Sequence, residues 1–140
     1  MFLDKKHYLT KKMSLRNKQS IFALNVAKLI IYAYENGYEL TLGEVLRTIS
    51  QQYLYFMGYK LMKIGSSLKL AKTSRKSKTM FSKHLKKLAI DLNVFVDGRL
   101  LGKNDKELYK PLAEYWKSLH PKNTCGYYWN WDFGHFQMSE

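Results

Sequence analysis

Residues 88–96, with the sequence LAIDLNVFV, constrain the fold of this chain more than any other segment. A short apolar run followed by the turn-forming pair Asp97-Gly98 predicts a buried strand that returns as a hairpin over residues 99–101. Asp91 lies inside this strand, where a carboxylate costs free energy unless it is paired or bound to a metal. The sequence therefore predicts a core hairpin with one charged side chain that needs a partner.

Apolar side chains at helical spacing predict helices on either side of this strand. Strands are also expected over residues 38–42 and 135–137. This order of helices and strands indicates an α+β domain with a small antiparallel sheet and flanking helices. The expected helices cover residues 14–36, between an N-cap at Ser14 and a stop at Gly37, residues 49–63, and the segment from Asn104 or Asp105 to about residue 119.

The length and composition are those of a single globular domain. The chain has 140 residues, and 46% of them are hydrophobic, which is enough for one ordinary core. We therefore expect one domain over residues 1–140, with residues 1–17 as a basic N-terminal extension. Cys125 is the only cysteine, which excludes an intramolecular disulfide and disfavours a fold stapled for secretion. The most apolar run, residues 21–33, is too short to span a bilayer.

Positive charge is concentrated in the middle of the chain. The formal net charge is +13, and no acidic residue occurs between Glu44 and Asp91. Such a field attracts polyanions, whether nucleic acid, an acidic membrane face or an anionic cell-wall polymer. Residues 65–82 are rich in Ser, Lys and Thr, so we expect a long mobile loop there. This loop is either simply solvated or attracts anionic wall polymers or lipopolysaccharide.

Two of the four histidines occur near carboxylates in the sequence. His84 precedes Asp91 by seven positions, and His135 follows Asp132 by three. Two imidazoles and one carboxylate form a common catalytic Zn²⁺ set, which leaves one position open for a water molecule. On this hypothesis His84, Asp91 and His135 bind the metal. Asp132 is then the general base, and Arg47 neutralises the oxyanion that forms on a substrate carbonyl.

Each of these residues also has a structural explanation that the spacing leaves open. The alternatives are a solvated His84 beside the basic loop, a core His135 hydrogen-bonded to backbone, an Asp91 paired with a buried lysine or arginine, an Asp132 in an ordinary turn, and an Arg47 paired with Glu44.

Three motifs resemble one known family, and they follow one another along the chain in the family's order. Residues 43–48 resemble its G-E-x-x-R-T segment, and residues 132–137 resemble its closing D-x-x-H-F-E/Q motif. Residues 82–92 resemble its S-x-H-x-x-x-x-A-x-D-L signature. The family contains the D-alanyl-D-alanine carboxypeptidases and dipeptidases and the phage L-alanyl-D-glutamate endolysins. The similarity extends over roughly residues 18–137.

The resemblance implies a zinc DD-peptidase-like fold and hydrolysis of a peptide bond in the stem peptide of peptidoglycan. The resemblance implies that His84, Asp91 and His135 bind zinc, that Asp132 is the general base and that Arg47 contacts the scissile carbonyl. It also implies that Ser82 lies beside the site. Trp129 is expected either in the substrate groove or in the core. Residues 126–131 lack the W-G-G-D/R sequence that often precedes the closing motif, which leaves the shape of the groove open.

We therefore expect an L-Ala-D-Glu endopeptidase of the endolysin type, with a D-Ala-D-Ala carboxypeptidase as the alternative. A basic nucleic-acid-binding protein is the alternative of another class, although no zinc-finger, helix-turn-helix or RNP-like pattern supports specific nucleic-acid binding. A family member that only binds the wall is a third. We expect a monomer that is made in the cytoplasm without a signal peptide and reaches the cell wall after release.

Overall fold

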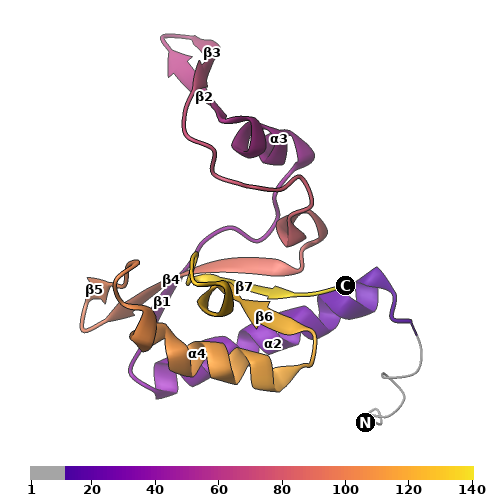
Figure 1. The fold of residues 1–140 in the computed structure, drawn as a ribbon, viewed down its shortest axis with the longest axis vertical. Helices are drawn as coiled ribbons and strands as arrows, with labels where there is room; N and C mark the ends of the chain where they lie inside the picture. Colours follow the sequence, from indigo (N-terminus) through magenta and orange to yellow (C-terminus); the bar gives the residue numbers. More distant parts are fainter. Residues whose placement is uncertain (1–11) are drawn as a thin grey trace.

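The computed structural model describes residues 12–140, and its main sheet is built around a strand that contains Asp91 (Figure 1). Every strand pair in this sheet is antiparallel, and the predicted hairpin and small antiparallel sheet are confirmed. The five strands are, in spatial order, β1 (Glu39–Leu42), β4 (Ala89–Val96), β7 (His135–Met138) and β6 (Asn123–Cys125), with β5 (Arg99–Leu100) paired to the far end of β4.

The alternation of side chains along β4 separates the hydrophobic core from the opposite face of the sheet. Ile90, Leu92 and Val94 are buried in the core. Helices α2 (Leu15–Glu35) and α4 (Lys106–Leu119) lie together on that side of the sheet (Figure 1). Successive residues of a strand point to opposite faces, so Asp91 lies on the face away from the helices. The core therefore packs against one face of β4, and the Asp91 side chain lies on the other face, outside the core.

Helix α3 (Ile49–Met57) and a hairpin of β2 (Tyr59–Ile64) and β3 (Ser67–Lys72) extend away from the sheet (Figure 1). We call residues 49–72 the arm. The predicted helix over residues 49–63 is wrong beyond Met57, because Gly58 adopts a left-handed conformation with φ +79° that ends the helix.

The predicted loop over residues 65–82 is also wrong in its first part. Residues 67–72 form β3, which pairs with β2 along its whole length across a tight turn at Gly65 and Ser66. Within the predicted loop, residues 73–82 lack regular structure. The serines and lysines of this segment suggested a loop, but alternating Leu68 and Leu70 form half of a hairpin.

The two core helices begin close to where the sequence predicts. The Ser14 side chain caps α2 by accepting a hydrogen bond from the N–H of Asn17, which confirms the predicted N-cap. Helix α4 follows Asp105, but the Asp105 carboxylate accepts hydrogen bonds from Arg99 and from the N–H of Gly102 instead of capping the helix. Strand β6 has no counterpart among the predicted elements.

The predicted N-terminal extension, residues 1–17, lies mostly outside the described residues, and residues 15–17 belong to α2. Within residues 12–140, every helix is too short or too polar to cross a membrane. The division of the chain into one domain stays a prediction.

Candidate metal centre and active site

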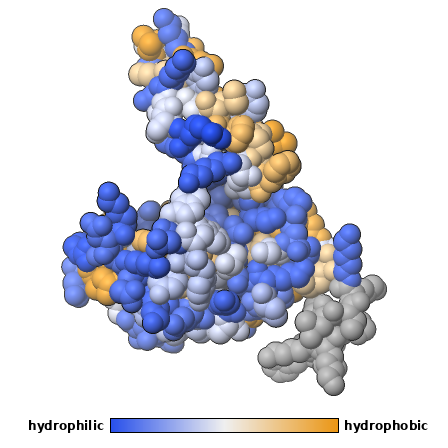
Figure 2. Space-filling view, viewed as in Figure 1, coloured by the Kyte–Doolittle hydropathy of each residue, from blue (hydrophilic) through white to orange (hydrophobic). Residues whose placement is uncertain are grey.

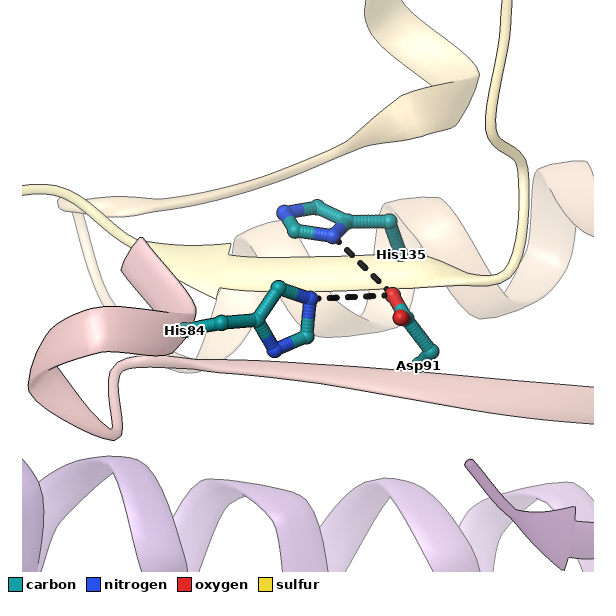
Figure 3. Close-up of side chains that lie close together, drawn as sticks. All are labelled: His84, Asp91 and His135. Carbon is teal, nitrogen blue, oxygen red and sulfur yellow. Dashed lines mark hydrogen bonds and ion pairs between the residues drawn. The ribbon is translucent and has the colours of Figure 1, made fainter. Parts of the chain in front are cut away.

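Three side chains of metal-ligand type meet on the face of the sheet opposite the helices (Figure 3). Asp91 comes from β4, and His135 lies directly across from it on β7. His84 comes from the 3-10 helix η1 (Lys83–Lys86), which immediately precedes β4. One ligand atom from each side chain lies within 4.8 Å of the other two. The structure thus brings together the three residues predicted to bind the metal.

Hydrogen bonds outside this cluster determine which nitrogen of each histidine faces Asp91. Nδ1 of His84 lies 2.9 Å from the carbonyl oxygen of Val45, which only accepts, so Nδ1 carries the hydrogen. Nε2 of His135 likewise donates to Oε1 of Gln137 at 2.8 Å. The other two nitrogens, Nε2 of His84 and Nδ1 of His135, lie 3.2 and 3.1 Å from Oδ1 of Asp91. When the imidazoles are neutral, these two nitrogens direct lone pairs toward one carboxylate, and when the imidazoles are protonated, the same nitrogens donate hydrogen bonds to it.

Lone pairs and a carboxylate oxygen that face one another repel, so positive charge between them, either protons on the imidazoles or a metal ion, stabilises this arrangement. Burial would raise the pKa of Asp91, but hydrogen bonds that protonated His135 and His84 donate to it, together with their positive charge, hold this pKa well below its usual range. Burial would lower the pKa of His135, but its bonds to Asp91 and Gln137 raise it. Two nitrogens and one carboxylate oxygen, with outer partners on both imidazoles, fit a catalytic zinc ion.

The segment that carries Arg47 is attached to this cluster through the backbone. The N–H of Gly43 donates to the carbonyl of Asp91 at 2.7 Å, and the N–H of Asp91 donates to the carbonyl of Glu44 at 2.9 Å. The N–H of Arg47 donates to the carbonyl of His84 at 3.1 Å. A Cβ atom at Gly43 would lie 2.7 Å from the carbonyl oxygen of Asp91, so this close approach requires glycine. These bonds place Arg47 beside the metal ligands.

Three side chains hold the Arg47 guanidinium. Nε forms an ion pair with the carboxylate of Glu44, which the sequence had left open as a structural explanation. Nη1 donates to Oε1 of Gln52 at 2.8 Å and to Oγ of Ser82 at 3.4 Å. Within residues 12–140, the hydrogen bonds of this guanidinium use Nε and Nη1. Nη2 therefore keeps its two hydrogens for a substrate.

Asp132 lies beside the cluster, on the loop that enters β7. Its Oδ2 is 3.7 Å from Nδ1 of His135. Partial burial raises the pKa of the Asp132 carboxyl, against the opposing charge of His135. A carboxyl group with a raised pKa is suited to accept and release a proton. The backbone of this loop lies against Gly126, where a Cβ atom would overlap the carbonyl oxygen of Asp132.

Two adjoining pockets, of about 340 and 280 Å³, open beside the cluster. Ser82 and Trp129, the two residues for which substrate contacts are predicted, line the second pocket. The Trp129 ring lies 5.8 Å from the His135 ring, between centroids. Arg47 and Asp132, the two predicted catalytic residues, line both pockets. Lys76 and Trp131 also line both.

The structure tests some of the structural explanations that the spacing left open for these residues. His84 is only 1% exposed, so the reading of it as a solvated side chain is wrong. Asp91 is paired with histidines, not with a lysine or arginine. Sequence reasoning missed Gln52, which is fully buried, and Gln137, which stands at the E/Q position of the closing motif. The motif offered a signal for Gln137, whereas nothing in the sequence marked Gln52.

His84, Asp91 and His135 could hold a metal ion, and an arginine and a carboxylate lie beside them. This combination of side chains is typical of hydrolytic metal centres. A family model described as D-alanyl-D-alanine carboxypeptidase matches residues 75–138. This part of the chain contains the three metal-ligand residues and Asp132. The resemblance predicted from the motifs is therefore confirmed over residues 75–138.

The fold is also similar to that of a solved peptidase. The crystal structure of the L-Ala D-Glu endopeptidase ChiX from Serratia marcescens superposes with a TM-score of 0.61. The two chains are 19% identical, and the match covers 89% of this chain and 83% of the other. No curated protein matches the sequence. The expected α+β, zinc DD-peptidase-like fold is confirmed.

Proposed function

We propose that the chain is a zinc-dependent peptidase that hydrolyses the L-Ala-D-Glu bond in the stem peptide of peptidoglycan. One observation carries the zinc dependence. Val45 and Gln137 accept hydrogen bonds from the outer nitrogens of His84 and His135, which leaves two imidazole lone pairs directed at Asp91. The peptide substrate is supported by the family match and by the similar fold of an L-Ala D-Glu endopeptidase.

The proposed reaction divides the chemistry between the metal and the side chains around it. A zinc ion held by His84, Asp91 and His135 would polarise the scissile carbonyl and lower the pKa of a water molecule. Asp132 accepts a proton as the water attacks, and it then donates a proton to the leaving amine nitrogen. Nη2 of Arg47 donates hydrogen bonds to the oxyanion that develops on the carbonyl.

The surroundings hold these groups in position. Glu44, Gln52 and Ser82 fix the orientation of the Arg47 guanidinium, so little reorganisation is needed when negative charge develops. The exposed Trp131 and the Trp129 ring offer flat apolar walls for the substrate peptide. We further propose that the protein acts as a monomer on the cell wall after release from the cytoplasm.

Mass spectrometry of muropeptides released from purified peptidoglycan tests the proposed bond. The proposal predicts products with a new D-glutamyl N-terminus. Loss of terminal D-Ala would instead show the carboxypeptidase activity that the description of the matching family names. No release by the zinc-loaded protein, together with tight DNA binding that falls steeply with salt, would replace the peptidase by a nucleic-acid-binding protein.

A further inference from the structure

The β2–β3 hairpin of the arm has aliphatic side chains without a core to cover them. Both strands are exposed along almost their entire length. A free two-stranded hairpin is marginally stable in water, and these exposed side chains contribute little burial to stabilise it. The most exposed aliphatic residues of the hairpin are Leu61 at 58%, Met62 at 41%, Ile64 at 52%, Leu68 at 69% and Leu70 at 59%.

The register distributes these side chains over both faces of the hairpin. Leu61 pairs with Leu70, so these two leucines share one face. Met62 is the next residue along β2 and therefore points to the other face, as does Ile64. Neither face is thus reserved for packing against the rest of the chain. In Figure 2 the arm stands free of the body, with apolar and hydrophilic surfaces side by side.

Lysines are interspersed among the aliphatic residues of the hairpin. Lys60, Lys63, Lys69 and Lys72 are all exposed. Among the described residues, no ion pair involves any of these lysines. The nearest acidic residues in sequence are Glu44 and Asp91, both outside the arm. The hairpin therefore combines uncompensated positive charge with exposed aliphatic surface.

From this combination we infer that the arm attaches the protein to the surface of a membrane that contains anionic lipids. The lysines are complementary to lipid headgroups, and leucine, isoleucine and methionine side chains enter the boundary between headgroups and acyl chains. This attachment lies beyond the proposed peptidase reaction and does not depend on it. It would hold the metal centre, whose pocket includes Tyr55 of the arm, close to the membrane.

Other partners fit the hairpin less well. A second copy of this chain carries the same +13 charge and would place lysines against lysines. Single-stranded nucleic acid is bound through aromatic platforms, whereas Tyr59 is the only aromatic residue of β2 and β3. A soluble anionic wall polymer would engage the lysines but leave the exposed leucines in water.

Sedimentation of the full chain with lipid vesicles tests the proposal. Vesicles of equal parts phosphatidylcholine and phosphatidylglycerol should bind the protein, and vesicles of phosphatidylcholine alone should not. Lys63→Gln combined with Lys69→Gln should weaken binding by about fivefold per lysine. Leu68→Ser combined with Leu70→Ser should weaken it by at least about tenfold.

Matched variants on the body of the protein serve as controls. Lys103→Gln with Lys110→Gln removes two exposed lysines, and Leu24→Gln with Ile31→Gln removes two exposed aliphatic side chains of α2. Both pairs should leave vesicle binding unchanged. Circular dichroism confirms that each variant is folded, and the lysine pair still tests the proposal if the leucine pair unfolds.

Three outcomes overturn the proposal. One is equal binding to both kinds of vesicle or equal losses in arm and control variants. Another is a lysine pair that loses affinity for soluble polyphosphate while vesicle binding stays intact, which would assign the arm to a soluble polyanion. The third is a leucine pair that changes only the oligomeric state, measured by light scattering, which would assign the hairpin to a contact between copies.

Discussion

The sheet and the arm place their apolar side chains in opposite environments. In the core beneath the sheet, Trp116 and Phe136 are at most 1% exposed, whereas Leu68 and Leu70 of the arm are 69% and 59% exposed. The packed core fixes the register of β4 and β7 and hence the geometry of the proposed metal ligands. Substitutions in the sheet should therefore alter stability and chemistry, while substitutions in the arm should alter what the protein binds.

The largest effect is expected in the core beneath the sheet. Trp116 is fully buried, and its Nε1 donates to the carbonyls of Thr124 and Gln137 at 2.9 and 3.1 Å. Trp116→Ala should lower the free energy of unfolding by about 3–5 kcal/mol, because it leaves a cavity and removes both indole hydrogen bonds. Urea denaturation followed by circular dichroism measures this. A loss below about 1 kcal/mol would contradict the packing of this core.

The metal centre should show the largest effect on activity. His84→Ala removes a proposed zinc ligand and should reduce peptidoglycan hydrolysis by a factor on the order of 10³ without unfolding the protein. The rate of muropeptide release measures the change. His120→Asn is the control, because His120 lies outside both pockets. Similar losses in the two variants would contradict a specific role for His84.

Thiol reactivity compares the two regions directly. Burial raises the pKa of Cys125 in β6 to about 11, so its thiol stays protonated at pH 8 and gains thiolate only as the pH rises toward that value. A cysteine introduced by Ser67→Cys in the arm is exposed and should react about a hundredfold faster with Ellman's reagent at pH 8. Equal rates for the two thiols would show that the sheet opens as readily as the arm.

The hydrogen bond from His135 to Gln137 should have a smaller effect. Gln137→Leu removes the acceptor that orients the His135 ring, and it should lower zinc affinity by about 10–100-fold. Gln137→Glu keeps an acceptor and should retain most of the affinity. Competition with a zinc-sensitive dye measures both. The orienting role is wrong if the two variants lose affinity equally.

The smallest effect is expected in the arm. Leu68→Ser should change the free energy of unfolding by less than about 0.5 kcal/mol, because Leu68 is already 69% exposed. Urea denaturation of this variant, run beside Trp116→Ala, gives the contrast between the two regions. A loss above about 2 kcal/mol would mean that the hairpin packs against the body of the protein.

Much of the sheet could be predicted from local sequence. The apolar run of β4, the Asp97-Gly98 turn and the Ser14 cap each determine structure within a few residues. The arm could not be predicted in the same way, because residues 53–64 contain apolar side chains compatible with either period. Gly58 ends α3, and pairing with β3 makes residues 59–64 a strand.

The candidate site shows the same limit. The spacing made His84, Asp91 and His135 candidate ligands, but their approach depends on a register that pairs Asp91 with His135 across two strands. The acceptor for His84 is the backbone carbonyl of Val45, which no side-chain pattern reveals. Sequence motifs thus named the ligands, while the hydrogen bonds that orient them follow from tertiary structure.

The central claim is that His84, Asp91 and His135 form one zinc site. Equilibrium dialysis against zinc tests it without any substrate. We expect one zinc ion per chain for the wild-type protein and for Leu68→Ser, and none for folded Asp91→Ala or His135→Ala. Zinc binding that persists unchanged in both of these ligand variants would contradict it.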